Sequence, residues 1–165
     1  MIIYEDVLRA FQRERVKYVL VGGIAVNLLG SLRNTADMDI LVEMSDKNLA
    51  KVVKILKKHG YRVKQPVDPM RIANKKTRED WINNKHMKAF NFYKENELKE
   101  VDIVIDSSVS YKEAKKDSVL IKAGITLHVI SIDNLIKMKK NTGRDVDKMD
   151  IKELREIKKL KKGPK

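Results

Sequence analysis

Two acidic residues two positions apart, Asp37 and Asp39, are the side chains of this chain best suited to chemistry. They open the segment 37–43, whose apolar residues Ile40 to Val42 are typical of a β-strand. On a strand, side chains at i and i+2 point to the same face, so the two carboxylates lie side by side. Such carboxylates repel each other unless a cation lies between them. The pattern therefore predicts a site for a divalent metal ion.

A glycine pair, Gly22-Gly23, lies between an apolar run at 18–21 and a short helical pattern at 24–29. Glycine permits a sharp turn from strand to helix. The N–H groups and the dipole at the start of a helix attract anions such as phosphates. A glycine turn of this kind near two metal-binding acids indicates phosphoryl or nucleotidyl transfer.

A nucleotidyl transfer site needs one more carboxylate, close to the attacking hydroxyl, besides the acids that hold two divalent cations. Asp102 is the best candidate, because it stands alone among apolar residues on the predicted strand 101–105. Asp106 shares that face, but it adjoins Ser107 and Ser108, where an acid commonly serves as a turn residue.

The order of these motifs resembles the DNA polymerase β-like nucleotidyltransferase superfamily. The segment VGGIAVNLLG, followed by RNTADMDI, is similar to the bacterial and archaeal branch that contains abortive-infection-type toxins and small stand-alone transferases. The segments 135–139 and 144–150 resemble the helical ending of that branch. The resemblance covers nearly the whole chain and is weakest at 65–95.

The resemblance implies a role for each matching residue. Asp37 and Asp39 would bind two Mg²⁺ (or Mn²⁺) ions, and Asp102 would bind the catalytic one. Gly22 and Gly23 would hold the β- and γ-phosphates of a nucleoside triphosphate, whose monophosphate passes to an acceptor hydroxyl as pyrophosphate leaves. The further nucleotide contacts implied are Arg33, Thr35 and Lys139.

Hydrophobic periodicity predicts an α/β (α+β) fold, a mixed twisted sheet flanked by helices with a helical C-terminal end. The expected strands are 17–21, 37–43, 61–64, 87–93, 101–105, 119–121 and 125–130. The expected helices are 4–15, 24–29, 46–58, 111–116, 135–140 and a last one from about 145. Asp46 is the expected N-cap of its helix, and Thr77–Asp80 resembles a capping box that opens a short helix.

The chain length predicts one nucleotidyltransferase-like domain over 1–165. Within it we expect a sheet-containing core at 1–130, C-terminal helices at 131–162 and a frayed tail at 163–165. No segment is apolar over the about 20 residues that a membrane helix needs, and no signal peptide is evident, so the expected location is the cytoplasm.

The net charge of +13 suits a polyanionic partner, either a nucleotide or a nucleic acid. It equally suits a Lys- and Glu-rich surface of a heat-adapted protein. The absence of cysteine excludes a thiolate metal site, and the histidines His59, His86 and His128 are too scattered to form one.

The acceptor stays open at this point: it is a tRNA 3′ end or other RNA, a protein hydroxyl, or a small molecule such as an aminoglycoside. The basic charge slightly favours RNA. The resemblance also implies a toxin–antitoxin setting, in which a partner protein or a homodimer completes the site.

One alternative is a catalytically inactive domain that binds nucleotide or nucleic acid as a regulatory or toxin–antitoxin module. Its main support is Gly23, because many members of the superfamily have serine there. A metal-dependent phosphohydrolase is weaker, since no histidine lies near the Asp-x-Asp motif.

Overall fold

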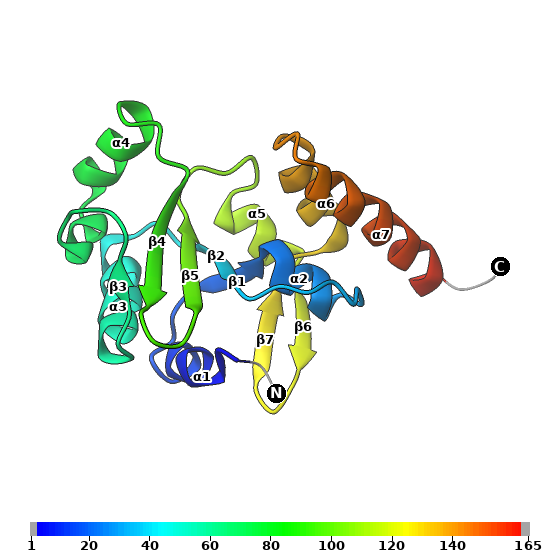
Figure 1. The fold of residues 1–165 in the computed structure, drawn as a ribbon, viewed down its shortest axis with the longest axis horizontal. Helices are drawn as coiled ribbons and strands as arrows, with labels where there is room; N and C mark the ends of the chain where they lie inside the picture. The colour runs from blue at the N-terminus through cyan, green and yellow to red at the C-terminus, as the bar shows by residue number, and fades with distance from the viewer. Residues whose placement is uncertain (1–2, 163–165) are drawn as a thin grey trace.

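A seven-stranded mixed sheet with the strand order β3-β4-β5-β2-β1-β7-β6 forms the centre of the molecule (Figure 1). The computed structural model describes residues 3–162, so the tail expected at 163–165 lies outside the described residues. The strands are β1 Tyr18–Val21, β2 Met38–Val42, β3 Arg62–Val63, β4 Ala89–Lys94, β5 Lys99–Val104, β6 Val119–Lys122 and β7 Thr126–Val129. The predicted mixed sheet with flanking helices is confirmed.

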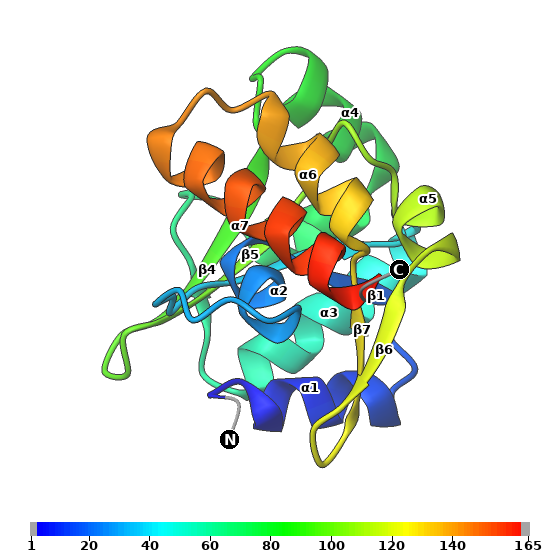
Figure 2. The same ribbon diagram turned by 90° about the vertical axis from the view of Figure 1, so that its right-hand side faces the viewer.

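The helices are α1 Glu5–Arg13, α2 Gly22–Leu28, α3 Asp46–Lys58, α4 Lys75–Asn83, α5 Tyr111–Lys116, α6 Ile132–Lys140 and α7 Asp145–Lys161, with a 3₁₀ turn at Pro69–Ala73. The helices α6 and α7 pack against each other at the end of the molecule away from β3 and α4 (Figures 1 and 2). Within residues 3–162, no helix has both the length and the apolar character needed to cross a membrane.

The register of the central strands determines which side chains meet. β2 runs antiparallel to β1, with Val21 opposite Asp39, and parallel to β5, with Asp39 opposite Asp102. Met38 and Ile40 alternate with Asp39 and are fully buried. Burial of these apolar side chains on one face fixes the register, because a slip by one residue would bury the acids instead. Asp39 and Asp102 are therefore direct neighbours on the sheet face opposite to the one that carries Met38 and Ile40.

Several helix starts differ from the sequence predictions; α6, for example, begins at Ile132 instead of residue 135. The side chain of Ser45, not of Asp46, caps α3 by accepting the N–H of Asn48 at 3.2 Å. The predicted capping box at Thr77–Asp80 is wrong, because α4 already begins at Lys75 and is capped by Asn74. In both cases the cap lies one step or more before the predicted residue, and its oxygen reaches the free amides of the first turn. The helix α2 begins directly at Gly22.

Candidate active site

Four carboxylates occupy one face of the sheet where β2 and β5 run side by side. Asp37 comes immediately before β2 and Asp39 lies in it, while Glu100 and Asp102 come from β5. Carboxylate oxygens of Asp37, Glu100 and Asp102 all lie within 4.8 Å of one another. Since Asp39 lies opposite Asp102, the structure brings the three predicted acids together and adds a fourth.

Glu100 is a member of this group that the sequence analysis missed. The signal was present, because Glu100 and Asp102 have the same i, i+2 spacing as Asp37 and Asp39. The predicted strand began at 101, whereas β5 begins at Lys99 and therefore includes Glu100. Its carboxylate is held by the ammonium of Lys64 at 2.6 Å.

The acids destabilise one another's charged forms in the absence of a metal ion. Burial, followed by repulsion from Asp102 and Asp37, raises the pKa of Asp39 to about 7. Burial also raises the pKa of Asp102, and a hydrogen bond from Asn91 opposes this shift. An all-oxygen set of ligands fits Mg²⁺ or Mn²⁺, and a bound cation would relieve the repulsion. The residues present therefore fit the predicted metal ions.

The glycine turn lies directly against this group of acids. Gly22 has a φ of +65°, and a Cβ atom there would lie 2.0 Å from Oδ2 of Asp39. The first turn of α2 has no side-chain cap and no acidic residue. Its amide groups are thus left without a side-chain acceptor next to the carboxylates, an arrangement suited to a bound anion.

Gly23 is glycine for a reason of space. A Cβ atom at Gly23 would lie 2.6 Å from the hydroxyl oxygen of Thr35 and 3.4 Å from the Cζ atom of Arg33. A serine there would collide unless the Thr35 side chain moved. The side chains of Thr35 and Arg33, both predicted to lie near the nucleotide, therefore pack over the glycine turn.

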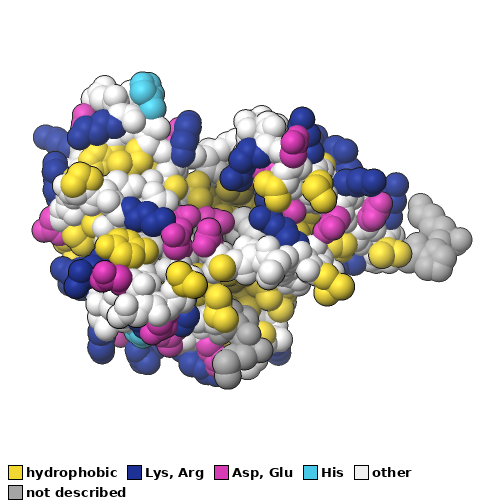
Figure 3. All heavy atoms as spheres, in the orientation of Figure 1, with side chains coloured by type: hydrophobic (Ala, Val, Ile, Leu, Met, Phe, Trp, Pro, Cys, Tyr) yellow, Lys and Arg dark blue, Asp and Glu magenta, His cyan; other side chains and the backbone are white. Residues whose placement is uncertain are grey.

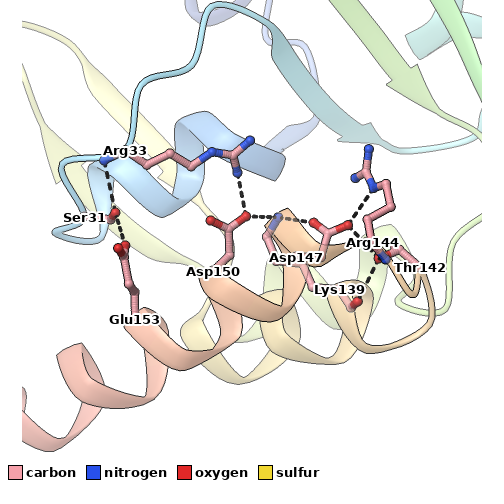
Figure 4. Close-up of polar contacts among 8 residues, drawn as sticks. All are labelled: Ser31, Arg33, Lys139, Thr142, Arg144, Asp147, Asp150 and Glu153. Carbon is pink, nitrogen blue, oxygen red and sulfur yellow. Dashed lines mark hydrogen bonds and ion pairs between the residues drawn. The ribbon is translucent and has the colours of Figure 1, made fainter.

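Lys139 and Arg33 belong to a buried network of charges between α6, α7 and the loop before β2 (Figure 4). The ammonium of Lys139 lies 3.0 Å from a carboxylate oxygen of Asp147 and 2.9 Å from one of Asp150. The guanidinium of Arg33 lies 2.5 Å from the same Asp150 oxygen. Lys139 is thus bound to two acids, although its charge is near enough to lower the pKa of Asp39. Its contact with a phosphate stays a prediction.

Two acids of α7, Asp147 in its first turn and Asp150, are almost completely buried, with exposed side-chain fractions of 2% and 3%. Burial tends to raise the pKa of Asp147, but hydrogen bonds from Thr142, Arg144 and Lys139 outweigh it and lower the pKa to about 2. The two acids therefore hold cations rather than merely favour the helix dipole.

Seen from outside, acidic side chains gather near the centre of the face on which β4 and β5 lie, with basic side chains beside them (Figure 3).

A sequence profile of the aminoglycoside-2''-adenylyltransferases matches residues 4–154. The chain belongs to the aminoglycoside-2''-adenylyltransferase family. The protein is accordingly a nucleotidyltransferase, as its motifs predicted. No match was found among curated protein sequences.

Solved structures of two antibiotic adenylyltransferases share the fold of this family member. The lincomycin-bound lincosamide adenylyltransferase LnuA matches with a TM-score of 0.61 and 19% identity, over 92% of this chain and 93% of its own. ANT(2'')-Ia in complex with adenylyl-2''-tobramycin matches with a TM-score of 0.58 and 14% identity, over 96% and 92%. These similarities confirm the nucleotidyltransferase fold. Neither match is a toxin, so the finer resemblance to the toxin branch stays a prediction.

Proposed function

We propose that this protein transfers AMP from ATP to a hydroxyl group of a small-molecule acceptor, with two Mg²⁺ (or Mn²⁺) ions bound by its carboxylates. The observation that carries the proposal is the register of β2 and β5, which sets Asp39 opposite Asp102. The carboxylate of Asp39 also lies against Gly22, at the start of α2. Metal ligands and an uncapped helix start thus meet at one point, as the transfer of a nucleotide requires.

In the proposed reaction, Asp37, Asp39 and Asp102 would hold the metal ions, which when bound would neutralise the triphosphate and make the acceptor hydroxyl more acidic. The amides of Gly22 and Gly23 bind the β- and γ-phosphates. Asp102 takes the hydroxyl proton while the acceptor oxygen forms a bond to the α-phosphorus. The bond from that phosphorus to the bridging oxygen breaks, and pyrophosphate leaves.

The cations near the site support binding of the triphosphate. Arg33 packs over the glycine turn. Its side chain is 27% exposed, and its guanidinium forms an ion pair with Asp150. Lys139 is more deeply buried, and its charge favours the ionised form of Asp39. We therefore assign Arg33, Thr35 and Lys139 to the nucleotide side of the site.

A small-molecule acceptor is favoured because the family is named for such a substrate and because the profile covers the chain nearly from end to end. The net charge of +13 favours RNA instead, and the toxin resemblance favours RNA or a protein. These acceptors are the alternative outcomes of the test.

The test incubates the protein with ATP labelled at the α-phosphate, Mg²⁺, and separate acceptors: aminoglycosides, lincosamides, tRNA and a protein extract. We expect the label on a small molecule, with an equal amount of pyrophosphate. Calorimetry with each of the four nucleoside triphosphates measures the base preference. Asp39→Asn should abolish binding and transfer, whereas Asp117→Asn, an exposed acid outside the site, should change neither.

Label on tRNA or protein alone would contradict the acceptor class and leave the transferase activity standing. A folded protein that binds no nucleoside triphosphate in the presence of Mg²⁺ would contradict the proposed function. Equal turnover by Asp39→Asn would contradict the mechanism.

A further inference from the structure

Two side-chain amides form a chain of hydrogen bonds that ends on Asp102. On the antiparallel neighbour β4, Asn91 lies opposite Asp102, and its Nδ2 donates to Oδ1 of Asp102 at 2.7 Å. Gln65, in the segment after β3, donates from Nε2 to Oδ1 of Asn91 at 2.8 Å. The backbone N–H of Asn91 donates to Oε1 of Gln65 at 3.2 Å.

This chain of hydrogen bonds has only one consistent direction. A backbone N–H can only donate, so the atom of Gln65 that faces it must be the carbonyl oxygen. The amide nitrogen of Gln65 then faces Asn91, which must present its own oxygen there. The amide nitrogen of Asn91 is left pointing at Asp102, an acceptor when ionised. The direction is thus set by the backbone of β4.

Asp102 needs such a donor because of its surroundings. Its carboxylate oxygen lies within 4.8 Å of those of Asp37 and Glu100, and Asp39 is its neighbour across the strand pair. Without a donor on one side, repulsion would favour rotation of the carboxylate away from the other three acids. The hydrogen bond from Asn91 to Oδ1 restrains that rotation and keeps the carboxylate of Asp102 in the acidic group.

We propose that Gln65 and Asn91 are positioning residues that hold the carboxylate of Asp102 in its working orientation. The inference rests on the proposed function for the role of Asp102. Neither amide needs to touch the substrate. Outer partners that orient a metal ligand typically contribute about 10–100-fold to metal affinity or activity.

The experiment compares wild type with Asn91→Ala, Gln65→Ala, the double variant and Asn96→Ala. Asn96 is the matched control, because it is exposed in the turn between β4 and β5 and has the same side chain. The affinity for Mn²⁺ is measured without nucleotide, and kcat and KM for ATP are measured with the acceptor that the labelling assay identifies.

We expect Asn91→Ala to weaken Mn²⁺ binding and to lower kcat by about 10–100-fold, with a smaller change in KM for ATP. Gln65→Ala should change both quantities in the same direction but less. The double variant should match Asn91→Ala, since Gln65 acts only through Asn91. Asn96→Ala should match wild type.

If Asn91→Ala and Gln65→Ala both keep the Mn²⁺ affinity and the kcat of wild type, the proposal is overturned. If the losses of Mn²⁺ affinity and kcat add fully in the double variant, Gln65 acts independently of Asn91, and the proposed chain from Gln65 through Asn91 to Asp102 is overturned. If Asn91→Ala does not fold, Gln65→Ala carries the test, since Gln65 lies outside the strands. If wild type shows no transfer but Mn²⁺ binding follows the expected pattern, the proposed function fails and the positioning of Asp102 stands.

Discussion

At the scale of single residues, the site depends on a close approach between a backbone turn and a carboxylate. Gly22 is the position where this approach leaves no room for a side chain. The sequence already indicated the importance of the glycine pair and of Asp37, Asp39 and Asp102, because type and spacing carry that signal. It could also have revealed Glu100 by the same spacing rule.

Substitution of Gly22 tests this close approach. We expect Gly22→Ala to lower the free energy of unfolding by about 1–2 kcal/mol for the left-handed backbone alone, and further because its Cβ atom would displace Asp39. Mn²⁺ binding, measured by calorimetry, should weaken. Gly143→Ala is the matched control, because Gly143 has a φ of +70° and no heavy atom within 4 Å of an added Cβ. Equal effects of the two substitutions on Mn²⁺ binding would contradict this account.

The raised pKa of Asp39 predicts a pH dependence of the metal-free protein. Asp39 faces Asp37, Asp102 and the charge of Lys139, and its pKa is about 7 instead of 3.8. Between these values the folded state holds a proton that the unfolded state has lost. The contribution of Asp39 to the free energy of unfolding therefore falls as the pH rises through this window.

Urea unfolding with a chelator measures this effect. Asp39→Asn should be more stable than wild type at pH 8, and the difference should shrink at pH 5. Saturating Mg²⁺ should stabilise wild type at pH 8, because the ion binds only the folded state. An unchanged difference between the two pH values would rule out Asp39 as the titrating group, and Asp117→Asn should follow wild type throughout.

At the scale of elements, the pairing of α6 with α7 brings buried charges together. Periodicity predicted most of these helices and strands within a few residues, because one face of each is apolar. It could not predict that Arg33 meets Asp150, since 117 positions separate them and only the packed helices bring them together. Nor could it predict the caps, which depend on which nearby oxygen reaches a free amide.

Removal of Lys139 tests the network in Figure 4. Breaking a buried ion pair from one side typically costs about 3–5 kcal/mol. We expect Lys139→Met to lower the free energy of unfolding by about 3 kcal/mol, near the lower end, because Asp147 keeps Arg144 and Asp150 keeps Arg33. Lys137→Met is the control on the same helix, with an exposed ammonium, and should cost less than about 1 kcal/mol. Similar losses in urea unfolding would show that the network contributes no more than a surface pair.

At the scale of the whole molecule, the net charge of +13 acts on every part of the fold. Lysines are spread over the surface, so their mutual repulsion favours expansion. Ion pairs at the surface each contribute little, whereas the network around Lys139 is buried and only weakly screened by salt. Repulsion is thus the term that salt changes most.

We expect NaCl to stabilise the protein, with a higher urea midpoint at about 1 M than at about 0.1 M, where the screening lengths are about 3 Å and about 10 Å. A variant with Lys47, Lys54 and Lys85 changed to Glu should depend less on salt, since all three are exposed. A midpoint that falls with NaCl in wild type would mean that surface attraction outweighs repulsion.

The position of α7 in the chain also has a consequence for protein synthesis. The four acids are complete by residue 102, whereas the carboxylates that hold Lys139 and Arg33 belong to a helix that begins at Asp145. Ribosomes add about 5–20 residues per second, starting at the N-terminus. A nascent chain therefore carries its acids for several seconds before the ordered cations exist. On the proposed mechanism, Arg33 and Lys139 are fixed on the nucleotide side of the site only when α7 has emerged and docked.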